Sequence, residues 1–136
     1  MANISLVTAN KVEVVESFEQ MTLPAAEAIT AGAPVRLDTT SGKFTNANGT
    51  TTAENRIYGI AVKTAAAGMP VTAIRRGVLD GFDFSGNNYD AAIYLSDTDG
   101  RLGDTAGTVS TVVGRVIPGT SEALGTAFSK LLLVHL

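Results

Sequence analysis

The ionisable side chains of this sequence offer few combinations that could do chemistry. The only histidine is His135, between Val134 and Leu136. A general base needs a nucleophile or a second ionisable group within hydrogen-bond reach, so a lone histidine among apolar residues is typical of a structural or exposed position. Cysteine is absent, which removes thiolate chemistry, disulfides and Cys-ligated zinc. We therefore predict no enzymatic activity and no catalytic residues.

Two glycine-containing patterns that could hold a ligand are incomplete. Residues 97–100 (DTDG) are similar to part of a calcium loop. The EF-hand pattern would require Asp in place of Leu95 and Glu in place of Ala106, so a hairpin turn is the better interpretation. The glycine-rich segments also lack the Lys-Ser/Thr ending of a phosphate loop. We predict no metal and no cofactor.

Residues 77–86 (GVLDGFDFSG) resemble the uridine-recognition hairpin of trimeric dUTPases, in which glycine, an apolar pair, two aspartates, an aromatic residue and glycine recur. The sequence departs from that pattern by one extra residue. It also lacks the Asp-Ala-Gly-type motif, the Arg-Ser phosphate motif and the glycine-rich tail, and a motif counts only in its full context. We favour a turn in which Phe82, Phe84 and Tyr89 pack on the domain. A dUTPase-like β-clip nucleotide-binding domain remains the alternative from another functional class.

Composition argues against nucleic acid and membrane as partners. The formal net charge is −3, and the basic residues are scattered apart from the adjacent pair Arg75 and Arg76, so no basic patch for nucleic acid is predicted. The longest apolar run, residues 131–134, is far too short to span a bilayer, and residues 1–10 do not have the pattern of a secretory signal. We expect a protein made in the cytoplasm that binds no small-molecule substrate.

The regular succession of short apolar runs predicts an all-β domain. The best-organised stretch is residues 57–79, which predicts two strands joined by a turn at Gly68 and Pro70. Further strands are predicted at residues 35–38, 91–95, 109–117 and 128–136. A chain of 136 residues is one domain by the usual size prior.

An internal repeat relates two parts of this domain. Residues 35–44 (VRLDTTSGKF) match residues 93–102 (IYLSDTDGRL) position for position, and residues 57–62 (IYGIAV) lie over residues 112–117 (VVGRVI). Both later strands contain an interior glycine, which is typical of a bulge or of close backbone approach. We predict a small β-barrel or β-clip-like domain with internal two-fold character.

Over residues 23–136 an ordered set of short motifs resembles tailed-phage capsid cement, or head decoration, proteins. The motifs are residues 31–35 (AGAPV), 58–61 (YGIA), 65–71 (AAAGMPV), 76–78 (RGV), 93–95 (IYL), 100–102 (GRL) and 114–116 (GRV).

This resemblance implies a non-enzymatic virion protein that forms a homotrimer. It would sit on the outer surface of an icosahedral head and clamp neighbouring major capsid subunits. A head-fibre or a tail or baseplate module is the alternative within the same structural class.

The N-terminal residues stand outside the repeat. Val12 and Val14 predict a short strand, and Val15, Phe18 and Met21 follow at helical or irregular spacing. We therefore divide the chain into an N-terminal arm, residues 1–20, and a β-barrel decoration domain, residues 21–136.

The arm is the first candidate for contacts with other subunits. It is expected to be mobile in the free protein and ordered on the shell, with packing against its own domain as the alternative. The candidate capsid or inter-subunit contacts are the apolar residues of the arm and the adjacent basic pair: Ile4, Leu6, Val7, Arg75 and Arg76.

Overall fold

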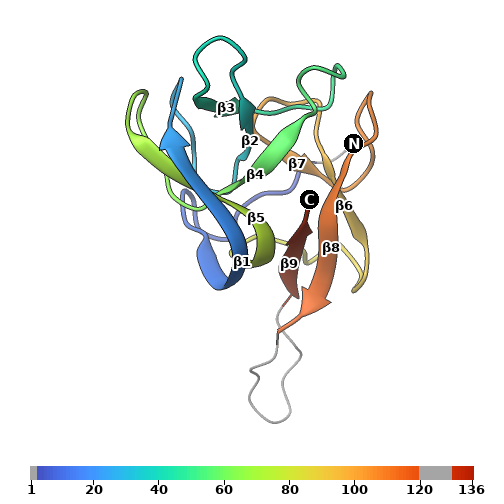
Figure 1. Cartoon of the computed structure of the whole chain (residues 1–136). Helices are drawn as coiled ribbons and strands as arrows, with labels where there is room; N and C mark the ends of the chain where they lie inside the picture. The colour runs from blue at the N-terminus through green and yellow to red at the C-terminus, as the bar shows by residue number, and fades with distance from the viewer. Residues whose placement is uncertain (1–2, 120–129) are drawn as a thin grey trace.

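The computed structural model describes residues 3–119 and 130–136. Within these ranges the regular structure is entirely β, with nine strands in one antiparallel sheet and no helix, so no described segment could cross a membrane as a helix. Figure 1 shows that the sheet curls into a half-barrel. The all-β prediction is thus confirmed. The strands are β1 (Glu13–Pro24), β2 (Pro34–Leu37), β3 (Phe44–Asn46), β4 (Ile57–Ala61), β5 (Pro70–Asp80), β6 (Ala92–Leu95), β7 (Leu102–Gly103), β8 (Val112–Pro118) and β9 (Lys130–His135).

Strand β5 connects the parts of the sheet. On one edge β4 pairs with Ala73 and Ile74, and β9 pairs with the stretch from Arg76 to Leu79. Strand β1 pairs with β5 along its whole length, and because a strand has only two edges, β1 must occupy the other one. The remaining strands follow in the order β3-β2-β4-β5-β9-β8-β6-β7. The predicted strand–turn–strand of residues 57–79 is confirmed, and Gly68 has a φ of 84° in the turn.

Strand pairing within the unit β2–β3–β4 is the same as strand pairing within the unit β6–β7–β8. In each, the first strand pairs with a short second strand and with a third strand that contains a glycine, and a register shift follows the glycine pair. The equivalent pairs are Leu37 with Phe44 and Leu95 with Leu102, and Val35 with Gly59 and Ile93 with Gly114. These residues are the ones that the sequence comparison superposes. That the two units arose as a repeat stays a prediction.

Glycines allow the backbones of neighbouring strands to approach closely. A Cβ atom at Gly114 of β8 would overlap the carbonyl oxygen of Leu133 in β9, and a Cβ at Gly77 of β5 would overlap the carbonyl oxygen of Glu16 in β1. At Gly59 of β4 a Cβ would lie 2.9 Å from the carbonyl oxygen of Ile74. The tight curl of the sheet therefore depends on the missing side chains at these three strand crossings.

The core has a large and a small part. The large cluster fills the half-barrel with side chains of β4 to β9 and of the segments beside them, among them Ile60, Leu79, Ile93 and Leu132. The small cluster lies between β2, β3 and the first half of β5 and contains alanines around Phe44. Strand β5 contributes to both clusters and so joins them.

The sequence-based description of residues 13–24 was wrong. The expected short strand and ambiguous element are one continuous strand, β1. The boundary drawn between residues 20 and 21 lies within this strand, and the division into an arm and a decoration domain stays a prediction. Val15 and Phe18 have no partner on β5, because one register shift spans Val15, between Val14 and Glu16, and another spans Phe18, between Ser17 and Glu19. A third shift lies between Glu19 and Gln20. Such β-bulges add one residue to a strand without ending it. They explain why the apolar residues of β1 recur at a spacing that does not fit simple strand alternation.

The close strand approaches generate a test of the fold. Replacing Gly114 by Ala forces β8 away from β9, and overpacking of this kind typically costs about 1–3 kcal/mol of unfolding free energy. Gly86 is the matched control, because a Cβ there meets nothing within 4 Å. Thermal or denaturant unfolding should show Gly114→Ala clearly destabilised and Gly86→Ala close to wild type. Equal stability of the two variants would contradict the close approach.

Candidate functional site

The segment from Asn3 to Val7 packs on its own domain. The amide of Ile4 donates to the carbonyl of Leu102, and the amide of Val7 donates to the carbonyl of Gly81, both at 2.8 Å. These bonds lie beside the end of β7 and just beyond the end of β5. In the structure these residues therefore pack on their own domain, which was the alternative to a mobile arm.

The five candidate contact residues lie in different environments. Ile4 is 9% exposed and belongs to the large core cluster, and Leu6 is partly buried against that cluster, so neither is available to a partner in this conformation. Val7 is 74% exposed. Arg75 forms an ion pair with Glu19 of β1 and lies over the ring of Tyr58, whereas Arg76 is exposed on β5. The structure therefore leaves Val7, Arg75 and Arg76 at the surface.

Strand β1 is exposed to an unusual degree for a strand. Every residue from Glu13 to Thr22 is exposed, although the strand is hydrogen-bonded to β5 along its length. The large apolar side chains among them are Val14, Val15, Phe18 and Met21, with exposed fractions of 43%, 48%, 70% and 43%. Contiguous exposed apolar residues mark interaction surfaces on soluble proteins. The only indication of this surface in the sequence was the set of apolar residues between the glutamates. Because of the bulges, these residues do not show the regular alternation by which a strand is recognised.

The outer edge of β1 also lacks the cover that the two ends of the sheet have. Outside β3, Ala26 donates to the carbonyl of Phe44, and outside β7, Ile4 donates to the carbonyl of Leu102. No backbone partner is recorded on the outer edge of β1 within residues 3–119 and 130–136. An uncovered edge strand can pair with another chain, which natural proteins restrain with charges and bulges.

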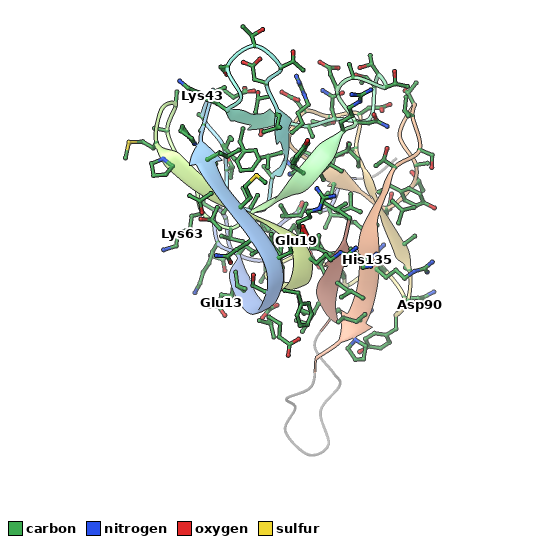
Figure 2. The ribbon with its side chains drawn as sticks, viewed as in Figure 1. Glu13, Glu19, Lys43, Lys63, Asp90 and His135 are labelled. Atoms are coloured by element: carbon green, nitrogen blue, oxygen red, sulfur yellow. The ribbon has the colours of Figure 1, made fainter. Side chains whose placement is uncertain are left out.

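Both restraints are present on β1, and its charge is all of one sign. The strand contains three glutamates and neither lysine nor arginine. Glu13 pairs with Lys11 at 3.6 Å and Glu19 with Arg75 at 3.3 Å. Glu16 has no ion-pair partner in the described part of the chain. Figure 2 labels Glu13 and Glu19 along this strand. The surface defined by β1 is thus acidic and apolar together.

The segment that resembles a uridine hairpin is structural here. Phe82 and Phe84 are buried and stacked on one another with ring centroids 5.8 Å apart. The carboxylate of Asp80 accepts from the amide of Gly81, and that of Asp83 accepts from the amide of Ser85. Hydrogen bonds from Ser85 lower the pKa of Asp83 below its ordinary value. Both carboxylates stabilise local turns.

The aspartates of residues 97–100 fasten two loops together. Asp97 accepts from the amide and the hydroxyl of Thr108, each at 2.8 Å, and Asp99 accepts from the side-chain amide of Asn48 at 3.1 Å. The bonds from Thr108, its backbone amide first, lower the pKa of Asp97 below its ordinary value. The described residues contain no cluster of three or more His, Asp or Glu that could hold a metal ion. The arrangement favours the hairpin interpretation over a calcium loop.

An open groove of about 420 Å³ lies between the N-terminal segment, residues 28–33 and the β6–β7 hairpin. Its two charged side chains, Asp99 and Arg101, are already hydrogen-bonded within the chain, to Asn48 and to the carbonyl of Ile4. A ligand site needs polar groups that converge on the ligand. We therefore place the candidate functional site on β1 and not in this groove.

One of the comparisons with known proteins found a match. A family model described as phage cement protein matches residues 6–76, just over half of the chain. No curated protein and no solved structure matches. The matched region contains the whole of β1 and most of β5.

The packing of the N-terminal segment can be tested with two substitutions three residues apart. Ile4→Ala removes a buried side chain and should lower the unfolding free energy by about 2–5 kcal/mol. Val7→Ala is the matched control, because Val7 is 74% exposed, and it should change stability by less than about 0.5 kcal/mol. Chemical denaturation of both variants measures the difference. An Ile4→Ala protein as stable as wild type would return the segment to the role of a detached arm.

The Asp97 loop gives a pH-dependent prediction. Its folded-state pKa lies below the ordinary value of 3.8, so its stabilising effect is present above pH 3.8 and disappears as the pH falls through the folded pKa. Asp97→Asn should therefore melt at a lower temperature than wild type at pH 7, and the difference should shrink as the pH is lowered below about 3.8. A gap that stays constant down to pH 2 would rule out this linkage.

Proposed function

Because the chain belongs to the phage cement protein family, we propose that it binds the outside of an icosahedral phage head as a homotrimer and stabilises contacts between major capsid subunits. The family assigns a structural role in the phage capsid. The trimeric state, the outer surface and the major capsid protein as partner are the parts that we add. The observation that carries the proposal is the family match, and the exposed β1 within the matched region supports it.

The physical basis of such a role is linkage between binding and assembly. A protein that binds the assembled shell, and not its separated subunits, stabilises the shell by mass action in proportion to the logarithm of its concentration over its dissociation constant. A trimer that contacts several capsid subunits gains further, because each later contact forms within one complex. Such avidity can exceed the affinity of a single contact about a hundredfold or more. Individually weak surface patches are then sufficient.

The surface of this chain fits weak, repeated contacts. Charged residues make up only 17% of the sequence and hydrophobic residues 45%, so many small uncharged groups are available for packing against neighbours. The described surface adds the exposed apolar residues Val7, Phe18 and Met21. Both features suit association with other subunits.

The decisive experiment mixes purified protein with expanded, undecorated heads of its own phage and measures co-sedimentation. We expect saturable binding, and heads that resist heat or chaotropes better after binding than before. Purified tails of the same phage are the control, and they should bind little. Saturable binding to tails with none to heads would replace the proposal by the tail or baseplate alternative, and no binding to either would reject it.

A further inference from the structure

A second surface of the chain complements β1 in charge. Strand β8 contains Arg115, and β9 contains Lys130 and His135, and neither strand contains a carboxylate. The ammonium of Lys130 donates to the carbonyls of Phe84 and Asn87 within the chain, so Arg115 is the cation that this surface offers. In β1 the situation is reversed, with glutamates and no basic residue. The two surfaces therefore attract one another when they come from different copies of the chain.

The burial pattern shows which groups of β8 and β9 face solvent. Val112 and Arg115 are exposed on β8, and on β9 Leu133 is partly buried and His135 is exposed. The register places Leu133 beside Arg115, and His135 beside Arg76 of β5. Figure 2 shows His135 at the end of β9. The exposed cations of this outer face are thus Arg115 and the neighbouring Arg76, and its apolar side chains are Val112 and Leu133. Arg115 also lies 3.5 Å from Asp90 in an exposed pair, and such pairs contribute little.

We propose that β1 of one copy docks on the outer face of β8 and β9 of the next copy, with Phe18 as its central apolar contact, and that three such contacts close the homotrimer. This inference rests on the proposed function, and it names the surface through which the trimer forms. The contact is heterologous, since two different patches meet, and heterologous contacts that close produce rings.

Charge selects this arrangement over pairing of β1 with another β1. Two β1 strands would bring six glutamates into one interface, because each strand contributes three. Like charges opposite one another on paired strands are destabilising. The β8–β9 face instead offers Arg115 to the unpaired Glu16, and Val112 and Leu133 to the neighbouring Val15 and Phe18.

The size of the contact is set by the shorter of the two surfaces. Strand β8 has 7 residues and β9 has 6, which at about 3.3 Å per residue gives a face about 20 Å long. That length matches the middle part of β1 around Glu16 and Phe18. Each contact is therefore smaller than the roughly 800 Å² per partner of a standard interface, and the three contacts of a closed ring support one another.

The test measures the mass of the full-length protein in solution as a function of concentration, for example by sedimentation equilibrium. Two single variants weaken one side of the contact each: Phe18→Ser and Glu16→Lys on β1. Arg115→Glu weakens the opposite side. Met69→Ser is the matched control, because Met69 is also exposed but lies in the turn before β5. Circular dichroism and thermal unfolding check that each variant remains folded.

We expect wild type and Met69→Ser to form trimers. Phe18→Ser should dissociate at a concentration at least about tenfold higher than wild type, as for central apolar contacts. Glu16→Lys and Arg115→Glu should each weaken assembly, and the double variant Glu16→Lys/Arg115→Glu should recover part of the loss, because the reversed charges attract again.

Several outcomes would overturn the proposal. A wild-type protein that stays monomeric at high concentration rejects it, as does a Phe18→Ser protein that trimerises like wild type. If Phe18→Ser trimerises normally but no longer binds heads, β1 contacts the capsid and not a second copy. A wild-type trimer that depends on Phe18 but does not bind heads leaves this contact standing and rejects the proposed function instead.

Discussion

The fold depends on one strand, β5, which pairs with three other strands and contributes to both parts of the core. Strand β5 pairs with β4 and β9 in succession on one edge and with β1 along the other. Its side chains enter both core clusters. Gly77 makes this sharing possible, because any side chain there would overlap the backbone of β1. The sheet can therefore curl without splitting, and the consequence is that β1 lies outside the half-barrel with little of it buried.

Local signals in the sequence were sufficient to predict the strands and turns that pair with neighbours close along the chain. Gly68 and Pro70 mark the turn and the start of β5, and both are found there. The N-terminal segment was different. Ile4 and Val7 are similar in character, yet one is in the core and the other is exposed. Which of them is buried depends on the position of β7, about a hundred residues further along the chain, and no local pattern contains that information.

Strand β1 was obscured for a related reason. A strand that packs on one side alternates apolar and polar residues, but β1 has both faces open and three register shifts against β5. In β1, therefore, neither burial nor the spacing of the apolar residues alternates from one residue to the next. The short motifs that resemble cement proteins begin after this strand, at residue 31, whereas the family model matches from residue 6. The candidate site thus lies in the part of the match that motif spacing alone did not identify.

The features of β1 reconcile two conflicting requirements. Under the proposed function, the protein has to remain soluble until a shell is available and then adhere through weak contacts repeated many times. Exposed apolar residues serve the second requirement and endanger the first, because an uncovered edge strand invites uncontrolled pairing. Glutamates between those residues oppose pairing with identical strands, and the bulges at Val15 and Phe18 interrupt the regular edge that such pairing needs. The same glutamates attract a cationic surface. In the contact that we propose, the negative charge of β1 therefore disfavours pairing between two β1 strands and still allows β1 to bind a positively charged surface.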